Sequence, residues 1–324
     1  MQDLTEITAP ISEDLLKVKE AFADLLHSPV KVINLIAGHL VKQRSKGLRP
    51  ILVLLSGRLC SDLSPETYLA AALVEMLHNA TLIHDDVIDD ATVRRGGPTL
   101  NAIWKNRISV LIGDYILARS LSTAVKLNKL EAIEILSESS ARMTQGEIAQ
   151  LMNSRKKNIT EEEYFKVIAD KTAALISACC QLGAISVSAP DNQVKTLKNF
   201  GEKIGMAFQI KDDLLDIDGE EKLFGKRRGT DLKNGKVTLP LIYALEQVGK
   251  SQKSKIIKKV KKKAKRTDVN AIISFIKDQG GFEYAEKTAE DYIDEAKKDL
   301  CSFPDSDYKQ AMLKLTQYII QRKR

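Results

Sequence analysis

The stretch His84-Asp85-Asp86-Val87-Ile88-Asp89-Asp90 ends the apolar run 69–88 with four carboxylates in six residues. Like charges this close raise one another's pKa values and need a counter-charge. On a helix, Asp85 and Asp89 are four residues apart and share a face, with Asp86 beside them. The residues 69–88 therefore predict a long apolar helix that ends in an acidic cluster.

A second acidic cluster, Asp212-Asp213-Leu214-Leu215-Asp216, repeats the same spacing later in the chain. Each cluster ends an apolar helical pattern, so we expect two carboxylate walls that face each other across a cavity. Carboxylate oxygens suit hard divalent cations that also bind substrate phosphates. The rest of the chain is expected to surround this cavity.

The composition favours helices, because Leu, Ile, Ala, Lys and Glu dominate and aromatic residues make up only 5%. No strand-type alternation, Rossmann glycine fingerprint, P-loop or short repeat is present. We therefore predict an all-α fold, a large single-domain bundle over residues 1–324. The expected helices cover residues 12–26, 29–43, 51–60, 66–89, 108–126, 129–152, 161–188, 193–217, 238–249, 251–265, 268–279, 281–300 and 305–322.

Three breaks between these helices carry cations. In Lys46-Gly47-Leu48-Arg49-Pro50, the proline disfavours helix at Arg49 and is expected to start the next helix at residue 51. Residues 91–100 contain Arg94-Arg95-Gly96-Gly97-Pro98 and are predicted to form a mobile basic loop. Residues 218–237 form a long polar loop beside three carboxylates, and we favour a lid there.

The net charge of +7 comes from one segment, residues 250–266, which holds ten Lys or Arg and no acid. Removing these ten charges leaves a net charge of −3. The simplest interpretation is a solvated helix face, and the alternative is transient contact with an anionic membrane surface during product release. No nucleic-acid partner is expected, because the segment is not joined to aromatic residues or a binding module.

The four cysteines, Cys60, Cys179, Cys180 and Cys301, lack disulfide or metal-ligand spacing and are predicted to be buried thiols. The sequence has no basic and apolar N-terminal signal and no uninterrupted apolar run of about 18 residues. We therefore expect a cytoplasmic protein.

Polar residues beside the breaks suggest a polyanion site. His78 lies two helical turns before Asp85, and Gln209 shares a stripe with Asp212. A site with metal-binding acids and several cations suits a diphosphate, because magnesium bridges the acids to phosphate oxygens while Lys and Arg neutralise the remainder. No Ser-His-Asp, Cys-His or zinc-type pattern is present, so metal-assisted loss of a diphosphate leaving group fits best. The cations are Lys46, Arg49, Arg94, Arg95, Lys171, Lys226 and Lys236.

The ordered motifs resemble those of the trans-isoprenyl diphosphate synthases, long-chain type. The two aspartate-rich motifs are matched by residues 84–89, followed by Arg94-Arg95-Gly96, and by residues 208–216. Other family motifs match in the right order, so the resemblance spans roughly residues 40–245. These further matches are Lys46-Gly47-Leu48-Arg49-Pro50, Gly113-Asp114-Tyr115, Lys171-Thr172 and Gly229-Thr230-Asp231-Leu232-Lys233.

The resemblance implies an isoprenoid synthase fold, normally a homodimer, that extends an allylic diphosphate with isopentenyl diphosphate. It assigns Mg²⁺, three ions per active site when substrate is bound, to Asp85, Asp89 and Asp212, supported by Asp86, Asp213 and Asp216. The implied contacts to the allylic diphosphate are Arg94, Lys171 and Lys226, with Thr172 and Gln209 near the allylic cation. The implied contacts to isopentenyl diphosphate are Lys46, Arg49, His78 and Arg95, with Lys236 assisting in the lid.

Two departures from the family pattern concern loops. Arg44-Ser45 stands where the family often has glycines, and Arg227-Arg228 makes the lid more basic than usual. His84 and Asp90 are interpreted as flanking groups outside the site.

Product length depends on the helix that carries Asp85. Short-chain members often have bulky aromatic residues four and five positions before the first motif aspartate, where this chain has Thr81 and Ala80. The small side chains predict an open channel and a product longer than fifteen carbons, in the range C30–C50. The resemblance to the long-chain type implies a role in quinone side chains. Candidate walls or floor of the channel are Met76, Leu77, Leu73, Leu117 and Leu121.

Four alternatives stay open. A short-chain synthase making C15–C20 products would share all these motifs. A class I terpene cyclase shares the first acidic motif but needs no isopentenyl diphosphate site. A non-catalytic partner subunit of a heteromeric synthase is disfavoured by the intact acids, and a nucleic-acid-binding module around residues 250–266 is the most distant.

Overall fold

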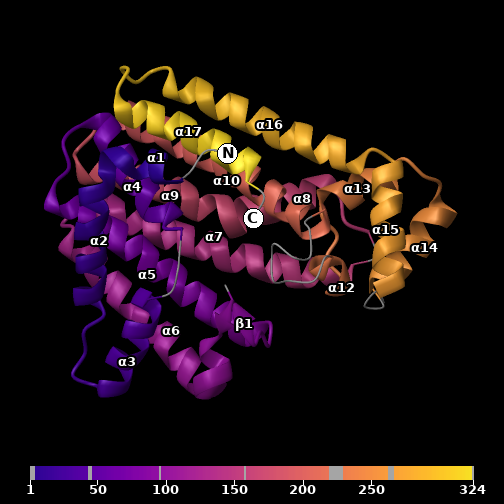
Figure 1. Ribbon diagram of the computed structural model, residues 1–324, viewed down its shortest axis with the longest axis horizontal. Coiled ribbons are helices and arrows are strands. Elements are labelled where there is room, and N and C mark those ends of the chain that lie inside the picture. Colours follow the sequence, from indigo (N-terminus) through magenta and orange to yellow (C-terminus); the bar gives the residue numbers. More distant parts are fainter. Residues whose placement is uncertain are drawn as a thin grey trace.

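The structure, a computed structural model, describes residues 4–42, 46–94, 96–156, 158–218, 229–261 and 266–322. Helices make up almost all of it (Figure 1). The one pair of strands among the described residues is a short hairpin, and each strand has two residues. The all-α prediction is therefore confirmed. Whether residues 1–324 behave as a single domain stays a prediction.

The first half of the chain supplies the helices around the first acidic cluster. It contains α1 (Leu4–Thr8), η1 (Ala9–Ile11), α2 (Ser12–Leu25), α3 (Lys31–Lys42), α4 (Leu48–Cys60), α5 (Pro65–Ile88), strands β1 (Val93–Arg94) and β2 (Gly97–Pro98), α6 (Leu100–Lys126) and α7 (Leu130–Arg155).

The second half supplies the helices around the second acidic cluster. It contains α8 (Glu161–Ile168), the π-helical turn η2 (Ala169–Ala173), α9 (Ala174–Ser186), α10 (Asp191–Asp218), α12 (Thr230–Lys233), α13 (Leu239–Glu246), α14 (Lys250–Lys261), α15 (Arg266–Asp278), α16 (Gly281–Leu300) and α17 (Asp307–Gln321).

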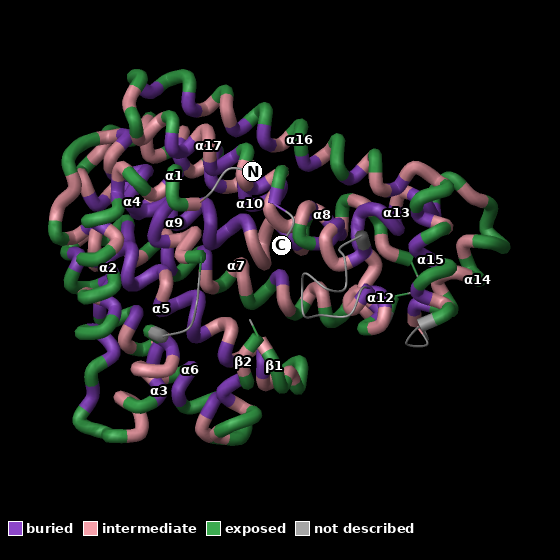
Figure 2. The backbone as a smooth tube through the Cα atoms, in the orientation of Figure 1, coloured by how far each residue is buried: buried purple, intermediate pink, exposed green. Residues whose placement is uncertain are grey.

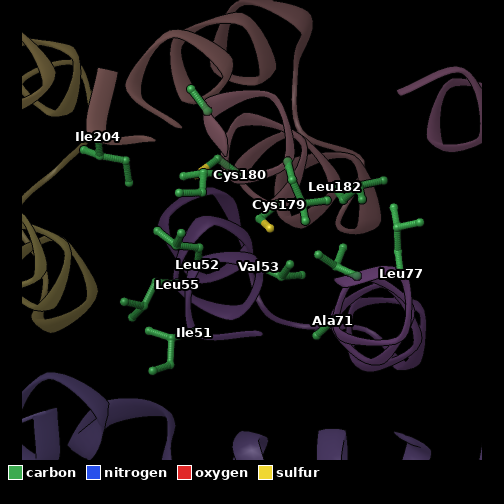
Figure 3. Close-up of a cluster of buried hydrophobic side chains, with 14 of the residues drawn as sticks. Ile51, Leu52, Val53, Leu55, Ala71, Leu77, Cys179, Cys180, Leu182 and Ile204 are labelled. Atoms are coloured by element: carbon green, nitrogen blue, oxygen red, sulfur yellow. The ribbon is translucent and has the colours of Figure 1, made fainter. Parts of the chain in front are cut away.

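Helices α4, α5 and α9 form the centre of the main core. Their inward apolar side chains pack against one another, as for Leu52 of α4, Ala71 of α5 and Leu182 of α9 (Figure 3). Gly183 allows the closest approach, because a Cβ there would lie 2.2 Å from the carbonyl oxygen of Val53. This packing fixes α5, whose last turn carries the first acidic cluster.

The N-terminus of α5 is set by local chemistry. Ser64 and Thr67 form a capping box, and Pro65 stands in the first turn, where its missing N–H costs nothing. From there α5 runs to Ile88, close to the predicted bounds. The helix therefore delivers Asp85 and Asp86 to the centre of the molecule.

A second, smaller core joins α12–α15 and includes the buried side chains of Leu241, Val260 and Ile272. These helices lie at the other end of the molecule from α2 and α4, and buried segments run through them (Figure 2). Val237 and Phe282 contact both cores. The basic helix α14 rests on this core through Ile256, Ile257 and Val260, while its lysines stay largely exposed.

The structure corrects several details of the prediction. Helix α4 begins at Leu48, not at residue 51, because Gly47 adopts a left-handed conformation and Pro50 fits inside the first turn. Residues 91–100 contain the β1–β2 hairpin where only a loop was predicted. Helix α6 begins eight residues earlier than expected, at Leu100, with a break at Lys105.

The cysteine prediction holds for Cys179 and Cys180, which are buried in α9. It is wrong for Cys301, which is exposed, whereas Cys60 is partly buried.

By length and composition alone, two helical stretches could cross a membrane, Leu100–Lys126 and Glu161–Ser186. The apolar window of the second is 72% buried inside the protein and that of the first 39%. Core helices of soluble proteins pass the same test, so the finding is weak evidence for a membrane span.

Candidate active site

The first acidic cluster occupies the last turn of α5. Asp86 is buried, and one of its carboxylate oxygens accepts a hydrogen bond of 2.6 Å from the Nε of Arg94. Asn101 donates to the Asp86 carbonyl oxygen and so ties the start of α6 to the same turn. Asp86 therefore anchors the hairpin cation, and Asp89 remains exposed at the end of the helix.

Asp85 lines a cavity of about 390 Å³ together with Glu147 and Lys171. Burial raises its pKa to about 6, the negative charge of Glu147 adds to the rise, and Lys171 opposes it. Ionising this carboxyl is therefore costly while no cation is bound. A bound metal ion would lower that cost.

The acids of the second cluster each contact a different partner. Asp212 accepts a hydrogen bond of 2.8 Å from Nη2 of Arg322, whose guanidinium also lies 3.9 Å from the Phe208 ring centroid. The backbone N–H of Asp231 donates to the Asp216 carboxylate at 2.9 Å. Asp216 thereby holds the start of α12 against the end of α10.

Asp213 is buried and accepts hydrogen bonds from two side chains. Tyr164 donates its hydroxyl at 2.7 Å and Gln209 donates its amide at 2.9 Å. Burial and then the charge of Asp231 raise the pKa of Asp213 to about 7, against the effect of these two bonds. Burial also raises the pKa of Tyr164 well above its ordinary value, so Tyr164 remains a proton donor.

Lys171 and Thr172 lie on the π-helical turn η2, between the two acidic clusters. Lys171 forms an ion pair with Glu147 of α7 and donates to Gln150 at 2.8 Å. Thr172 donates its hydroxyl to Gln209 at 2.7 Å. Gln209 therefore links Thr172 to Asp213, and the predicted residues of this part of the site are brought together.

A further cavity of about 220 Å³ gathers three of the four residues assigned to isopentenyl diphosphate. Lys46, Arg49 and His78 line it together with Arg322. Arg49 and His78 also line the neighbouring cavity of about 390 Å³, which contains Asp85, Lys171 and Thr172. The two cavities are thus adjacent and share a wall.

Two further cavities continue past Lys171 towards α12. The smaller, about 110 Å³, is lined by Lys171, Gln209, Asp213 and Lys236. The larger, about 900 Å³, is lined by Asp89, Arg94, Glu147 and Lys236. Both acidic clusters therefore contribute to one connected set of cavities.

Lys236 stands at the boundary of these two cavities. It lies 3.2 Å from the Asp231 carboxylate. Burial acts to lower the pKa of Lys236, but Asp231 outweighs it and the pKa is raised. Lys236 is therefore a permanent cation beside the second acidic cluster.

The predicted chain-length residues lie one to three turns below Asp85 on α5. Met76, Leu77 and Ala80 are buried, and Thr81 lines the same cavity as Asp85. Among the candidate floor residues, Leu73 is buried, but Leu121 is 50% exposed on the outer side of α6. Leu121 does not close a channel within this chain.

Comparison with known proteins decides the family. The sequence model of the family described as "Polyprenyl synthetase" matches residues 30–276, about three quarters of the chain. The chain belongs to the Polyprenyl synthetase family. This confirms the resemblance on which the sequence interpretation rested.

Relatives of this family member cover its whole length. It is 34% identical to the octaprenyl diphosphate synthase of Escherichia coli K12, over 100% of this chain and 99% of that one. It is 37% identical to heptaprenyl diphosphate synthase component 2 of Geobacillus stearothermophilus, over 96% and 97%. A crystal structure of a decaprenyl diphosphate synthase from Rhodobacter capsulatus superposes with a TM-score of 0.94 at 35% identity, over 99% and 100%. The predictions of a prenyltransferase and of an isoprenoid synthase fold are confirmed.

Several residues around the synthase site were not foreseen. Glu147 and Gln150 of α7, Tyr164 of α8 and Arg322 come from helices far from the acidic motifs in sequence. The only indication of these residues in the sequence was a polar side chain among apolar neighbours. Many surface positions have the same pattern. Arg95 and Lys226, both predicted site residues, lie outside the described residues.

The donor set of the synthase site fits Mg²⁺. Within the part of the chain that the structure describes, no three His, Cys, Asp or Glu side chains already form a closed metal cluster. The acids nevertheless supply the hard oxygen donors that Mg²⁺ prefers. Burial, and then the negative charge of Glu147, raise the pKa of Asp85, and a bound cation would offset both effects. Mg²⁺ usually binds through one or two carboxylates together with substrate phosphates, so an open acidic set is the expected form.

Proposed function

We propose that this prenyltransferase condenses isopentenyl diphosphate with an allylic diphosphate, farnesyl or geranylgeranyl diphosphate. The product is a long-chain all-trans polyprenyl diphosphate for quinone side chains. The observation that carries the proposal is the pair of adjacent cavities that share Arg49 and His78. One contains Asp85 of the first acidic cluster, and the other is lined by the cations Lys46, Arg49 and Arg322, as two different diphosphates require.

In this proposal Asp85, Asp89 and Asp212 hold Mg²⁺ on the allylic diphosphate. Bound Mg²⁺, three ions per site, supplies Lewis-acid neutralisation of the leaving diphosphate oxygens. Asp86, Asp213 and Asp216 keep the site in shape through Arg94, Tyr164 and the backbone of Asp231. These three acids therefore act as supports.

The cations bind the two diphosphates. Arg94 and Lys171, with Lys226, neutralise the allylic diphosphate, while Lys46, Arg49, His78 and Arg95 hold isopentenyl diphosphate beside it. Lys171 exchanges its ion pair with Glu147 for the phosphate oxygens. Lys236, beside Asp231, supports closure over the site.

The reaction needs few protein groups once both substrates are bound. The allylic C–O bond breaks and its electron pair leaves with the diphosphate. The C4 carbon of isopentenyl diphosphate then attacks the cation, which Thr172 and Gln209 face through their side-chain oxygens. A proton leaves C2 and passes to the released diphosphate, which explains why no side-chain base is required.

In this proposal the growing chain takes a path from Asp85 past the small side chains of Ala80 and Thr81 towards Met76 and Leu77, which are buried. We infer from this path a product in the range C30–C50. The short-chain alternative, with C15–C20 products, requires a block at these positions that neither side chain provides.

We infer a homodimer assembled through α6. Its outer face exposes large apolar side chains, among them Ile103, Leu111, Leu121 and Val125. A relative named as component 2 of its enzyme keeps a heteromeric assembly as the alternative. We also place the enzyme in the cytoplasm, where the exposed lysines of α14 would allow transient contact with an anionic membrane surface during product release.

The test is incubation of the purified chain with farnesyl diphosphate, labelled isopentenyl diphosphate and Mg²⁺, followed by product sizing. Elongation to C30–C50 is expected. Product limited to C15–C20 would establish the short-chain alternative, and a cyclised hydrocarbon would establish a terpene cyclase. No elongation would overturn the proposal, unless activity returned with a second subunit, which would establish a heteromeric synthase.

A further inference from the structure

The turn η2, residues Ala169–Ala173, interrupts an otherwise continuous α-helix from Glu161 to Ser186. A π-helical turn is rare and usually occurs at functional sites, because it changes the direction of side chains relative to an α-helix. Here the turn carries Lys171 and Thr172. Whatever holds this turn also sets the direction of those two side chains.

The start of the turn is held by Arg142 of α7. The Nε of Arg142 donates to the Asp170 carboxylate at 2.8 Å, and Nη2 donates to the carbonyl oxygen of Ala169 at 3.4 Å. The same Nη2 donates to the carboxylate of Glu202 on α10 at 2.9 Å. One guanidinium therefore joins α7, η2 and α10.

The Arg142 contacts are well sheltered from water. The side chain of Arg142 is 24% exposed and that of Asp170 is 17% exposed. Burial acts to lower the pKa of Arg142, but Asp170 and Glu202 outweigh it and raise the pKa. Arg142 is thus a permanent cation, and its planar fork matches two acceptors that a lysine could not satisfy in the same geometry.

The rest of the turn is seated on two glycines. A Cβ at Gly146 of α7 would lie 2.6 Å from the backbone nitrogen of Lys171, and a Cβ at Gly205 of α10 would lie 2.5 Å from the Cα of Ala173. Both neighbouring helices therefore touch the backbone of η2 directly. The close contacts at Gly146 and Gly205 leave the turn no room to shift as long as Arg142 holds its first residues.

Arg142 itself does not reach the substrate cavities. It lines a small pocket of about 20 Å³ on the other side of the turn, with Ala174 and Ser177. Among the described residues, those lining the four cavities of the site do not include Arg142. Any effect of Arg142 on the reaction must therefore act through the elements that it joins, and among these η2 carries Lys171 and Thr172.

We propose that Arg142 is a positioning residue that aims Lys171 and Thr172 at the allylic diphosphate through the turn η2. The inference rests on the proposed role of Lys171 and Thr172. The two substrates should respond differently, because the hydrogen bonds of Arg142 go to Ala169, Asp170 and Glu202. Arg49 of α4 and His78 of α5, which are assigned to isopentenyl diphosphate, line a different cavity.

The test compares Arg142→Gln with the matched control Arg58→Gln. Arg58 is also a half-buried arginine paired with a buried carboxylate, Asp14, at 3.1 Å, and its side chain is 21% exposed. We expect Arg142→Gln to lower kcat about 10- to 100-fold. The KM for farnesyl diphosphate should rise about fivefold or more, while the KM for isopentenyl diphosphate stays within about twofold.

The control should separate positioning from stability. Arg58→Gln is expected to lower the melting temperature about as much as Arg142→Gln while keeping both KM values. Arg142→Lys should recover part of kcat and Glu202→Gln should show a weaker form of the same KM split. If Arg142→Gln does not fold, the KM values of Glu202→Gln test the proposal on their own.

Three results would overturn the inference. They are unchanged kinetics in a folded Arg142→Gln, an equal rise of both KM values, or the same split in Arg58→Gln. Absence of elongation by the wild-type enzyme is a different outcome, because it rejects the proposed function. In that case the dissociation constant of the unreactive analogue farnesyl S-thiolodiphosphate, measured by calorimetry, still tests Arg142: it should rise in Arg142→Gln and stay the same in Arg58→Gln.

Discussion

Asp85 sits where three influences meet: burial and the charge of Glu147 raise its pKa, and Lys171 lowers it. The folded carboxyl has a pKa of about 6, compared with 3.8 for the free side chain. Above pH 6 the carboxyl is ionised in both the folded and the unfolded chain, so the native state carries the full electrostatic cost. As pH falls from 6 towards 4, the folded carboxyl takes up a proton first and the cost disappears.

We therefore expect Asp85→Asn to stabilise the metal-free protein at pH 8 by up to about 3 kcal/mol, since one pKa unit corresponds to about 1.4 kcal/mol. The gain should vanish near pH 4, and turnover should be lost. Urea unfolding with a chelator present, repeated across this pH range, measures the effect. Asp89→Asn is the control, because Asp89 is exposed and its removal should give a much smaller gain. A gain that did not depend on pH would contradict the assignment.

Ala80 tests the proposed path of the growing chain. Its side chain is buried on α5, five residues before Asp85. Ala80→Phe adds a bulky ring to this path, and we expect the product to shorten to about C15–C20, with modest loss of stability from overpacking. Ala80→Ser, nearly unchanged in size, should keep the original length. Full-length product from Ala80→Phe, sized by chromatography, would show that the chain grows elsewhere.

Which site residues could be foreseen depends on the range of the interaction. Asp85 and Asp89 are local neighbours on one helix, so their spacing alone predicted the cluster. The ion pair between Glu147 and Lys171 joins residues from α7 and η2, and only tertiary packing brings these helices together. The same holds for Tyr164 and Asp213, which lie 49 residues apart.

At the scale of elements, the two glycines on α10 make a matched pair. A Cβ at Gly205 would meet the backbone of η2 at 2.5 Å, and a Cβ at Gly201, one turn earlier, would meet the Cα of Ser177 on α9 at 2.6 Å. Both alanine variants should therefore be destabilised by a similar amount, about 1–3 kcal/mol.

Of these two variants, only Gly205→Ala should also lower kcat, because Gly205 contacts the turn that carries Lys171 and Thr172 and Gly201 contacts α9 instead. Thermal unfolding and steady-state kinetics on the same samples measure both effects. Equal kcat values for Gly205→Ala and Gly201→Ala would mean that the position of η2 tolerates a shift.

The helices themselves were largely predictable, since apolar spacing marks buried faces. Their starts were less predictable. Pro50 indicated a break, yet a left-handed Gly47 let α4 begin before it. The turn η2 has no signature, because residues 169–173 have ordinary helical composition and the wider turn arises from contacts with α7 and α10.

At the scale of the whole molecule, α6 presents an apolar face that this chain does not cover. Ile103, Leu111, Leu121 and Val125 are 46–66% exposed, and burying such side chains is the main driving force of association. We expect a dimer by light scattering. A charge at the centre of the face, Leu111→Glu, should shift the mass towards the monomer.

Leu16→Glu is the control, because Leu16 is equally apolar and 58% exposed but lies on α2. A monomeric wild-type protein, or a dimer insensitive to Leu111→Glu, would contradict assembly through α6. The heteromeric alternative would be supported if Leu111→Glu left the light-scattering mass unchanged and activity required a second kind of subunit.

The ion pair between Lys171 and Glu147 has a consequence for the pace of catalysis. Each elongation cycle releases inorganic diphosphate from the cations that bound it, and release of product limits many enzymes. In the proposed mechanism Lys171 binds diphosphate, so Glu147 would compete with diphosphate for Lys171 and replace the departing anion in the resting site. The same contact that weakens substrate binding would therefore favour release of diphosphate. Many additions of isopentenyl diphosphate could then follow one another on a single prenyl chain.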